Sequence, residues 1–583
     1  MSARIVVGEG SCGLAAGAGA VYAAISEKLA DKAMLSITGC IGICYLEPIV
    51  DVYDEAGKLY RCVQVKPEDG QTIVNAVESG DYSLLDGFLI QQEDEAFLTG
   101  QTRIALRHCG LIDPESIDAY IAAEGYQALE KVLKTMTPEQ VIEEVKISGL
   151  GGRGGAGFPT WFKWNAARQS AGEEKYLICN ADEGDPGAFM DRAVIESDPH
   201  NLIEGMLIGA YAIGAKEAIV YVRAEYPLAI IRLEKAIRQA EEKGYLGENI
   251  LGTGFSCKMR IKAGAGAFVC GEETALIESL EGSRGMPRLK PPFPAQAGYW
   301  LKPSNINNVE TFANISWILQ NGGQAFAAMG TENSKGTKVF AVTGKVKRSG
   351  LVEIPMGKTL RDVIFGIAGG IRDGHEFKAV QLGGPSGGCI PAHLLDTVID
   401  YRALGATGAI MGSGGMVVMD ETTCMVGIAK FFLEFTTRES CGKCVHCRIG
   451  TKRLSEILER IVKGEGREGD IELLEELCVS IKDGALCGLG QTAPNPVLTT
   501  IRYFRNEYEA HIRDKKCPAK ECPALLTYSI DEATCIGCGL CAKKCPVHAI
   551  QGELKKPYAI DPAVCIRCGQ CIHSCRKGAV RVE

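Results

Sequence analysis

Two periodicities of apolar and polar residues alternate along the chain, and together they predict a multidomain protein of α/β and α+β class. In residues 1–80, short apolar strands surround one amphipathic helix at 21–33, the pattern of a small α/β unit. Residues 81–135 are polar and helical in pattern, so we expect a helical adapter. Residues 136–334 alternate apolar strands, such as 176–180, with long amphipathic helices, which predicts α/β layering.

The second half of the chain divides into shorter parts. Residues 335–424 begin with the strand-like TKVFAVTGKV and contain glycine loops, which favours a compact α+β module. Residues 425–512 are mostly helical, 513–528 form a linker, and 529–583 form a short cysteine-dense domain. This last domain is an internal duplication, because ATCIGCGLCAKKCPVHAI matches AVCIRCGQCIHSCRKGAV.

Composition narrows the classes of function. The net charge of −9 argues against nucleic acid as a partner, and no apolar run is long enough for membrane insertion. The first residues lack a secretory pattern, so we expect a reducing, cytoplasmic setting in which disulfides are rare. Of the 25 cysteines, 15 lie from Cys441 onward. Such clustering indicates metal or iron–sulfur ligation.

The duplicated cysteine run is the strongest chemical signal in the chain. Each half has the spacing C-x₂-C-x₂-C-x₃-C, in which three thiolates bind one [4Fe–4S] cluster and the fourth reaches the other. We therefore pair Cys575 with the first trio and Cys545 with the second. Two such clusters are favoured over zinc, which also uses C-x₂-C. The eight ligands are Cys535, Cys538, Cys541, Cys545, Cys565, Cys568, Cys571 and Cys575.

A second cysteine set lies in the helical region. Cys441, Cys444 and Cys447 share one turn, and Cys487 follows in the segment ALCGLGQTAPNP. This arrangement also suits a [4Fe–4S] cluster, which would be the third in the chain. His446 is interpreted as a neighbour of the cluster, because the three thiolates already have the regular spacing.

The N-terminal unit holds three thiols, on Cys12, Cys40 and Cys44. A [2Fe–2S] cluster needs four ligands, and Cys62, in the middle of a predicted strand, is the available fourth. Two interpretations stay open: a [2Fe–2S] cluster, or thiols that hold no cluster.

The linker before the C-terminal domain carries a fourth candidate site. His511, Cys517 and Cys522 have the ligand types and spacing of a structural zinc clip. The alternative is a pair of ordinary linker cysteines, since no fourth ligand is evident. Six scattered cysteines are expected to be small buried hydrophobes: Cys109, Cys179, Cys257, Cys270, Cys389 and Cys424.

A glycine-rich loop, SGLGGRGGAGFPTWFKW, is the candidate nucleotide site. Its G-x-G-x-x-G at Gly152, Gly154 and Gly157 follows a helical pattern, whereas the dinucleotide fingerprint follows a strand. We therefore interpret it as a backbone cradle for a phosphate or a flat ring, with Arg153 and Lys163 as positive charges.

Three polar segments follow predicted strands or begin helices near this loop, at residues 180–187, 264–273 and 306–311. Each alone could be a solvated turn. Polar residues at the carboxyl ends of strands are the expected ligands of an α/β sheet, so the three segments with the glycine loop favour a cofactor site.

These motifs resemble the NADH-binding flavoprotein subunit of respiratory complex I. The resemblance rests on GRGGAGFPT…KW, NADE, GAGAFVCGEE, INNVET and ESCGKCxxCRxGT, and covers about residues 136–512. It implies FMN in the glycine loop, NAD(H) stacked over the flavin, one [4Fe–4S] cluster on a helical bundle, and a ubiquitin-like module at 335–424.

The two ends extend the resemblance to nearly the whole chain. A thioredoxin-like unit at 1–80 and a two-cluster ferredoxin at 529–583 resemble the β subunit of electron-bifurcating [FeFe]-hydrogenases and of related NAD-dependent formate dehydrogenases. This implies an oxidoreductase subunit that couples NAD(H), ferredoxin and H₂ through flavin and iron–sulfur clusters. The alternative is a non-bifurcating NADH or formate dehydrogenase subunit, and a scaffold that has lost its flavin fits poorly.

The expected partners are a hydrogenase- or formate dehydrogenase-type catalytic subunit, a small thioredoxin-like [2Fe–2S] subunit and soluble ferredoxin. Carried onto this chain, the resemblance implies flavin contacts at Gly152, Arg153, Gly154, Lys163, Asn180, Asp182, Glu183, Glu272, Asn307, Asn308 and Thr311. It implies nicotinamide-side residues at Phe158, Asp185 and Glu273, and no catalytic triad. The chain departs from the family at Trp161, where glycine is usual, and at Val6 or Val7, where a cluster cysteine is usual.

Overall fold

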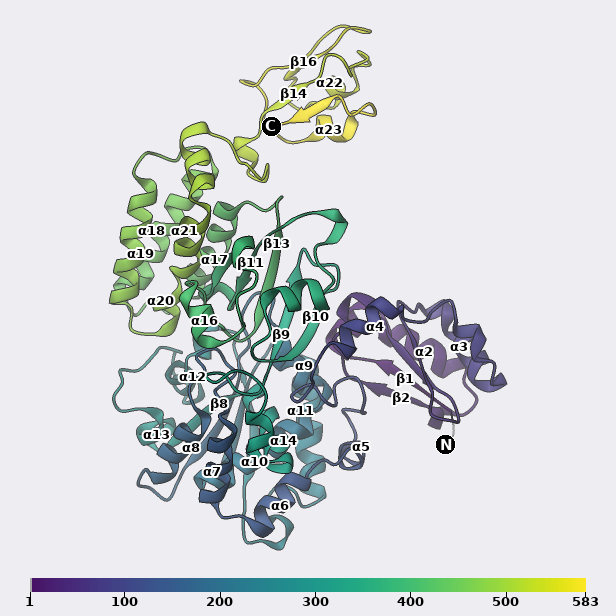
Figure 1. Cartoon of the computed structure of the whole chain (residues 1–583), viewed down its shortest axis with the longest axis vertical. Helices are drawn as coiled ribbons and strands as arrows, with labels where there is room; N and C mark the ends of the chain where they lie inside the picture. Colours follow the sequence, from purple (N-terminus) through teal and green to yellow (C-terminus); the bar gives the residue numbers. More distant parts are fainter. Residues whose placement is uncertain (1–2) are drawn as a thin grey trace. The chain divides into compact units, whose positions relative to one another are not determined.

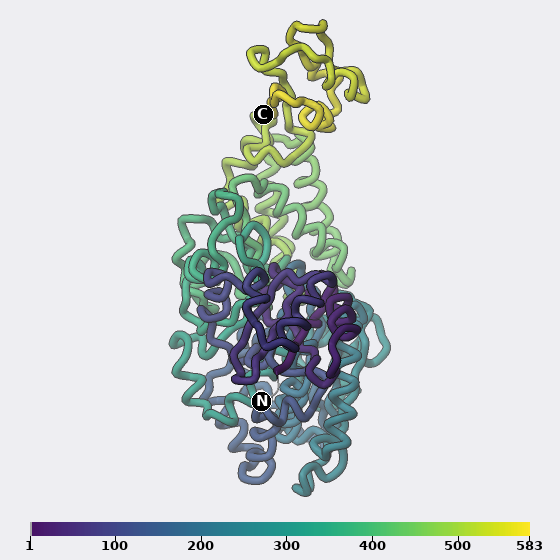
Figure 2. The backbone as a smooth tube through the Cα atoms, turned by 90° about the vertical axis from the view of Figure 1, so that its right-hand side faces the viewer, coloured from purple at the N-terminus to yellow at the C-terminus, as the bar shows by residue number. Residues whose placement is uncertain are grey.

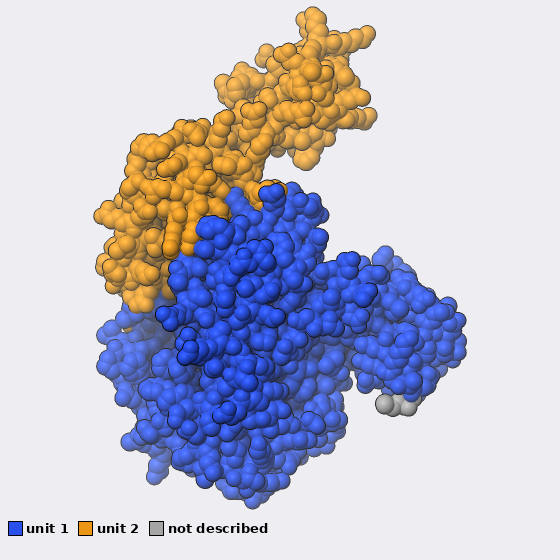
Figure 3. Space-filling view, viewed as in Figure 1, with its two compact units in different colours: residues 1–418, 486–489 blue, residues 419–485, 490–583 orange. Residues whose placement is uncertain are grey.

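The computed structural model describes residues 3–583 as two compact units (Figure 3). Of the described residues, one unit comprises 3–418 with 486–489, and the other comprises 419–485 with 490–583. No helix among the described residues has the length and apolar character needed to cross a membrane.

The N-terminal domain is a four-stranded sheet with helices packed against it (Figure 1). Its strands are β1 (Arg4–Gly8), β2 (Leu35–Thr38), β3 (Val50–Tyr53) and β4 (Leu59–Cys62), in the order β2-β1-β3-β4. Helices α2 (Ala18–Lys28) and α3 (Gly70–Ser79) complete its core. The sheet also bonds to a segment beyond residue 80, because Ile90 N–H donates to Arg61 C=O (2.9 Å).

Short helices follow in the region predicted as an adapter. These are α4 (Gln92–Thr99), α5 (Ile117–Ala122) and α6 (Gln127–Thr135). The buried Glu353 carboxylate accepts hydrogen bonds from the N–H groups of Ile104, Ala105 and Leu106 (2.9, 3.0 and 2.9 Å), which fixes this region to the module that follows.

The largest domain is built on four parallel strands in the order β7-β6-β5-β8. They are β5 (Tyr176–Ala181), β6 (Glu217–Arg223), β7 (Lys258–Gly264) and β8 (Ser304–Asn308). The helix α10 (Pro199–Ile213) is buried along almost its whole length between α14 (Val309–Asn321) and the sheet. Because α10 is enclosed on all sides, with His200, Asn201 and Glu204 buried among its apolar residues, it forms the centre of this domain.

A mixed five-stranded sheet forms the next module, in the order β10-β9-β13-β11-β12. Its strands are β9 (Thr337–Gly344), β10 (Gly350–Pro355), β11 (Phe377–Leu382), β12 (Gly388–Pro391) and β13 (Gly415–Asp420). Strands β9 and β10 form an antiparallel hairpin, and β13 runs parallel to β9.

The second unit begins with a helical bundle. Its long helices are α17 (Met425–Glu439), α18 (Val445–Val462), α19 (Asp470–Gly484) and α21 (Asn495–Glu509). Their apolar faces enclose one core, and Cys517, Cys522 and Leu525 of the linker are buried in that same core. The linker therefore packs on the bundle as far as Leu525.

The C-terminal domain is small and consists mostly of loops, as its trace shows (yellow in Figure 2). It contains two short antiparallel strand pairs, β14 (Tyr528–Ile530) with β17 (Val580–Val582) and β15 (Ile550–Gln551) with β16 (Ala559–Ile560). Its two helices are α22 (Leu540–Lys544) and α23 (Gln570–Ser574). Cysteine side chains make up much of its core.

Candidate cofactor and metal sites

The glycine loop joins helix α7 (Pro138–Ser148) to helix α8 (Thr160–Gln169) and closes on itself. Gly152 N–H donates to Phe158 C=O (2.8 Å), and the Tyr401 hydroxyl donates to Gly152 C=O (3.1 Å). Gly157 has φ +65°, and a Cβ there would lie 2.8 Å from the Tyr401 ring. The position therefore requires glycine on both conformational and steric grounds.

Arg153 anchors this loop from inside the protein. Its side chain is fully buried and donates to the carbonyl groups of Gly151 (3.1 Å) and Lys335 (2.7 Å). Its backbone N–H donates to the Thr311 hydroxyl (2.9 Å) at the start of α14. Of the two charges that the sequence placed at the loop, the Arg153 guanidinium thus points inward.

The loop lies at the carboxyl ends of β5 and β8. Asn180 and Asn308 are direct neighbours in the register of these strands, and a Cβ on Gly154 would lie 3.2 Å from the Asn308 Cβ. The Asn308 side chain also caps α14 by accepting from Thr311 N–H (3.3 Å). The carboxyl edge of a parallel sheet is where ligands bind in α/β folds, so this is the candidate cofactor site.

Trp164 and Asn180 fix the polar groups around that edge. The Trp164 indole N–H donates to the Asn307 side-chain oxygen (2.9 Å), and the Asn180 amide donates to Gly271 C=O (2.9 Å). Asp182 N–H donates to the Asn180 side-chain oxygen (3.0 Å). The structure therefore brings Asn180 and Asp182 together, whereas the Asn307 side chain is bonded to the buried Trp164.

Opposite charges meet beside the loop. Lys163 lies 3.0 Å from Glu273, while Lys290 lies 2.9 Å from Glu272 and 2.8 Å from Glu273. Burial opposes the charge of Glu273, but Lys163 and Lys290 outweigh it and hold the pKa of this carboxyl at about 2. Glu272 caps α12 (Glu273–Leu280) by accepting from Thr274 N–H (2.8 Å). Lys290 is a member of this cluster that the sequence did not indicate.

The acidic segment after β5 divides into residues with different surroundings. Glu183 accepts from the N–H groups of Asp191 (2.9 Å) and Arg192 (3.1 Å) at helix α9 (Met190–Ser197), so its carboxylate serves the helix start. Asp185 accepts from the Ser413 hydroxyl (2.6 Å). Burial raises the pKa of Asp185 to about 6.

Two phenylalanines form an open aromatic face next to the glycine loop. Phe158 and Phe162 are each 51% exposed, and their ring centroids lie 5.7 Å apart. Trp161 is partly buried, with the Lys146 ammonium 5.5 Å from its ring centre. Phe158 alone was expected at this site; Phe162, a second aromatic residue four positions further on, lies beside it.

These features fit a flavin mononucleotide. The tight loop lets backbone N–H groups approach a phosphate or ring, and the strand-end amides offer donors and acceptors. The exposed phenylalanine rings provide a surface for stacking.

The C-terminal domain brings its eight cysteines together in two groups. A cavity of about 240 Å³ is lined by Cys535, Cys538, Cys541 and Cys575, and a smaller one by Cys545, Cys565, Cys568 and Cys571. In both halves a backbone N–H donates to the last thiol, from Ala549 to Cys545 (3.2 Å) and from Ala579 to Cys575 (3.2 Å). The fourth cysteine of each run thus lines the other run's cavity, the arrangement of two-cluster ferredoxins.

The three closely spaced cysteines of the helical bundle, Cys441, Cys444 and Cys447, lie at the start of α18. Cys441 and Cys444 are in the loop before the helix, and Cys447 is in its first turn, with its thiol 3.3 Å from the Ser440 hydroxyl. His446 packs on the end of α19, where a Cβ on Gly484 would lie 2.4 Å from its ring. Cys487 stands in the turn that follows α19.

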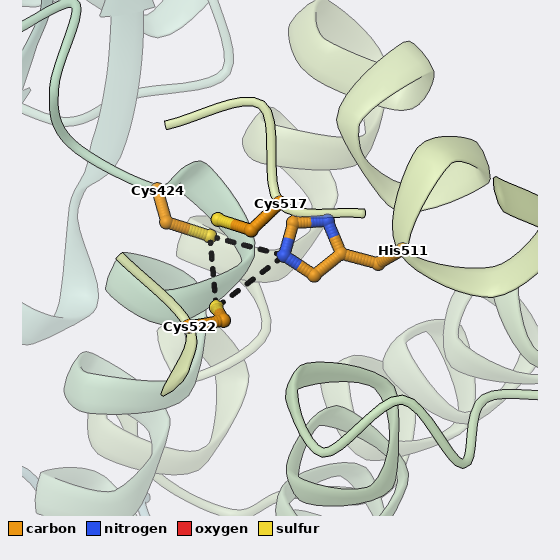
Figure 4. Close-up of side chains that lie close together, drawn as sticks. All are labelled: Cys424, His511, Cys517 and Cys522. Carbon is orange, nitrogen blue, oxygen red and sulfur yellow. Dashed lines mark hydrogen bonds between the residues drawn. The ribbon is translucent and has the colours of Figure 1, made fainter. Parts of the chain in front are cut away.

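The structure adds a fourth side chain, that of Cys424, to the zinc candidate. Cys424, His511, Cys517 and Cys522 are buried, and their ligand atoms lie within 4.8 Å of one another (Figure 4). The His511 Nε2 is 3.4 Å from both the Cys424 and the Cys522 Sγ, and these two sulfurs are 3.6 Å apart. Such edges fit a tetrahedral ion with metal–sulfur bonds of about 2.3 Å and metal–nitrogen bonds of about 2.0 Å.

The imidazole of His511 is oriented for metal binding. Its Nδ1 lies 2.7 Å from Glu507 C=O, and a carbonyl can only accept, so Nδ1 carries the proton. The Nε2 lone pair therefore faces the three sulfurs, as in metal sites whose outer hydrogen bond fixes the tautomer.

Cys424 was expected to be only a small buried hydrophobe, but its surroundings indicate a metal site. Cys424 is buried as expected, but it stands at the N-cap of α17 and its thiol faces the linker cysteines. It is 87 residues from His511 in sequence, so no local spacing could have revealed it.

In the N-terminal domain, Cys12, Cys40 and Cys44 meet at one point. The Sγ atoms of Cys12 and Cys40 are 3.0 Å apart, and those of Cys40 and Cys44 are 3.9 Å apart. Cys62 is instead packed in the core of the domain, and Val6 and Val7 are buried in β1. Cys62 is therefore not brought to the other three thiols.

Comparison with protein families gives three matches along the chain. Residues 145–317 match the Nuo51 FMN-binding domain, residues 427–511 match the NADH-ubiquinone oxidoreductase-F iron-sulfur binding region, and residues 528–551 match a 4Fe-4S binding domain. The matches coincide with the parallel-sheet domain, the bundle and the first half of the C-terminal domain.

Similar proteins include hydrogenase and respiratory subunits. The NADP-reducing hydrogenase subunit HndC of Solidesulfovibrio fructosivorans is 63% identical over 457 residues, which is 78% of this chain and 93% of HndC. An NADH-quinone oxidoreductase subunit of Rhizobium meliloti is 48% identical over 71% of this chain and 99% of its own length. A crystal structure of an air-oxidized NAD⁺-reducing [NiFe]-hydrogenase matches with a TM-score of 0.62 and 31% identity, over 88% of this chain and 85% of that one.

Proposed function

Because the chain belongs to the Nuo51 FMN-binding family of 51 kDa-type complex I subunits, we propose that it is the FMN- and NAD(H)-binding subunit of a cytoplasmic, electron-bifurcating hydrogenase. Its relatives are oxidoreductase subunits named for NADH-quinone reduction or for NADP-reducing hydrogenase activity.

The observation that carries the proposal is the meeting of the glycine loop with Asn180 and Asn308 at the carboxyl ends of β5 and β8. FMN, when bound there, exchanges a hydride with NAD(H) and single electrons with iron–sulfur clusters. Backbone groups of Gly152 and Gly154 would hold it, while Arg153 keeps the loop closed from inside.

The residues beside the loop would hold NAD(H). Phe158 and Phe162 offer an exposed face for stacking. Lys163 and Glu273 neutralise each other and would leave little net charge beside the nicotinamide ring. Asp185 offers a carboxylate that can accept hydrogen bonds from ligand hydroxyl or amide groups.

Cysteine sites provide the route away from the flavin. Cys441, Cys444, Cys447 and Cys487 would hold one [4Fe–4S] cluster, and the two cavities of the C-terminal domain would hold two more. Zinc at Cys424, His511, Cys517 and Cys522 would have a structural role, because all four positions are taken by protein.

The assignment to a hydrogenase is supported by the 63% identity to HndC, against 48% for the respiratory subunit of Rhizobium meliloti. The partners would be a catalytic subunit, a small thioredoxin-like [2Fe–2S] subunit and soluble ferredoxin. A second candidate is a subunit of a non-bifurcating NAD-linked enzyme, a hydrogenase or a formate dehydrogenase, and the likeness to the NAD⁺-reducing [NiFe]-hydrogenase favours the hydrogenase.

The test is the reaction of the purified assembly with H₂. We expect reduction of NAD⁺ or NADP⁺ that requires oxidised ferredoxin, with both acceptors reduced together. Equal reduction without ferredoxin would support the non-bifurcating candidate, and use of formate in place of H₂ would assign the other catalytic partner. An assembly without FMN would overturn both candidates.

A further inference from the structure

We propose that Cys12, Cys40, Cys44 and Glu47 together hold one four-coordinate Zn²⁺ ion, and that this site does not hold a two-iron cluster. The three thiols converge from helix α1 (Ser11–Ala16), the segment before residue 44, and the turn Cys44–Leu46. Glu47 follows that turn directly.

The three thiols are gathered as closely as the ligands of a single ion, and the Glu47 carboxylate lies against one of them. All three sulfurs lie within 4.8 Å of one another, and the Glu47 Oε1 is 3.6 Å from the Cys12 Sγ. Metal–sulfur bonds of about 2.3 Å and metal–oxygen bonds of about 2.1 Å give tetrahedral edges of about 3.8 Å between sulfurs and about 3.6 Å from sulfur to oxygen. The Cys40–Cys44 distance of 3.9 Å and the Cys12–Glu47 distance of 3.6 Å agree with these edges. The Cys12 and Cys40 sulfurs, 3.0 Å apart, are closer than such an edge, so binding of the ion would move them apart.

A two-iron cluster would need a different arrangement of ligands. Its four terminal ligands are shared between two irons, so ligands on different irons stand further apart than one tetrahedral edge. Here three thiols surround one point, and Cys62 is packed elsewhere in the domain core.

Glu47 is held in place as a ligand would be. Its side chain is buried, and Oε2 accepts from Ile49 N–H (3.0 Å), which leaves Oε1 facing Cys12. A Cβ on Gly13 would lie 3.2 Å from Oε2 and 2.2 Å from Gly8 C=O, so glycine is needed for the carboxylate to fit. A buried carboxylate beside thiols is costly unless a cation compensates for it.

Surrounding groups also fit a negatively charged metal site. Gly42 N–H points to the Cys40 Sγ (3.3 Å), and the partly buried guanidinium of Arg103 donates to Ile41 C=O (2.6 Å), between Cys40 and Cys44. Three thiolates and a carboxylate carry more negative charge than one Zn²⁺ neutralises, and Arg103 offsets part of the remainder.

The site would fasten the N-terminal domain to the parallel-sheet domain. Cys40 N–H donates to the Ser197 hydroxyl (3.1 Å), and Ser11 N–H donates to the Glu196 carboxylate (2.9 Å), both at the end of α9. Because zinc has no redox chemistry, the N-terminal domain would have a structural role and would not carry electrons.

The test compares zinc, iron and acid-labile sulfide per full-length chain in the wild type, Cys12→Ser, Glu47→Gln and the control Cys62→Ser. We expect Cys12→Ser to lose about one zinc with iron and sulfide unchanged, and Cys62→Ser to match the wild type. Glu47→Gln should release this zinc to a chelator roughly tenfold faster or more. Retained FMN shows that each variant is folded.

Loss of about two irons and two sulfides from Cys12→Ser would establish a binuclear cluster and overturn the proposal. Unchanged metal content in that variant would show that the thiols hold nothing. If Cys12→Ser does not fold, the Glu47→Gln release rate decides, and a rate equal to the wild type would remove Glu47 from the ligand set.

Discussion

The candidate flavin site requires a residue without a side chain at position 154. A Cβ there already approaches Asn308 to 3.2 Å, so the branched side chain of Gly154→Val must point into the space that the backbone leaves for a ligand. We predict that this variant loses most of its FMN and its NADH-driven dye reduction, with iron content unchanged. The measurement is flavin and iron per chain after purification.

The matched control is Gly87→Val, because Gly87 is exposed and a Cβ there meets nothing within 4 Å. This variant should keep its flavin. Full flavin occupancy in Gly154→Val would show that the loop does not bind the ring.

Asp185 should give the reaction a pH dependence. Burial raises its pKa to about 6, so the carboxyl is neutral below that pH and charged above it. If the charged form accepts hydrogen bonds from NADH, the KM for NADH should rise by up to about tenfold per pH unit below pH 6. A pH series of dye reduction measures this effect.

In Asp185→Asn the KM should be flat across pH 6, whereas the exposed-residue control Asp373→Asn should behave as the wild type. If the KM of Asp185→Asn still rose below pH 6, the pH dependence would belong to another group.

Among single residues, the candidate ligands that could be predicted from the sequence are those that lie within one turn of the chain. Cys535, Cys538 and Cys541 are recognisable because their spacing alone brings the thiols together. Cys424 and Glu47 were not recognisable as candidate ligands. The first is joined to its partners only by folding of the bundle, and the second is one of many acidic residues, in a turn whose shape the sequence does not reveal.

Among the elements, the linker before the C-terminal domain has a defined mechanical role. It is buried against the bundle as far as Leu525, and Thr527 N–H donates to Glu583 C=O (2.7 Å), so Thr527 already belongs to the C-terminal domain. Leu526 is already buried in the core of the C-terminal domain, so any hinge is confined to the junction between Leu525 and Leu526, much shorter than the 513–528 linker that the composition predicts.

The Cys₃His set should keep this linker attached. We predict that His511→Ala loses about one zinc per chain and is cleaved within residues 513–528 roughly tenfold faster, because local opening no longer requires release of a metal ion. Zinc analysis and limited proteolysis measure the two effects.

His573→Ala, at an exposed histidine of α23, is the control and should change neither value. Wild-type zinc content in His511→Ala would exclude His511 as a ligand.

Cys487 provides a test of the bundle cluster. Cys487→Ser should lower iron by up to about four per chain and slow electron exit from the flavin, while NADH still bleaches the flavin in a stopped-flow trace. Unaltered electron transfer to ferredoxin would place this cluster off the route.

The elements themselves were largely predictable where the pattern was regular. Strands β5 and β6 and the helix before the glycine loop follow from their apolar spacing. The end of the N-terminal domain did not follow, because the apolar segment around Ile90 is only three residues long and its backbone hydrogen bonds to the sheet cannot be inferred from so short a run.

At the scale of the whole molecule, the proposed function requires the C-terminal domain to exchange electrons with a carrier outside this chain. This domain has a small core made largely of cysteine side chains, so clusters would supply much of its stability. The sequence predicted its two-cluster character from the duplication, but a sequence without its partners does not identify the carrier.

The most direct test of the account is a chain that ends at Leu526, assembled with its partner subunits. We predict that NADH oxidation by artificial dyes is retained, because the flavin site lies in the other unit, and that exchange of electrons with soluble ferredoxin falls to background. If the shortened chain reduced or oxidised ferredoxin at the full-length rate, the C-terminal clusters would not be the ferredoxin port, and the bifurcating assignment would lose its main support.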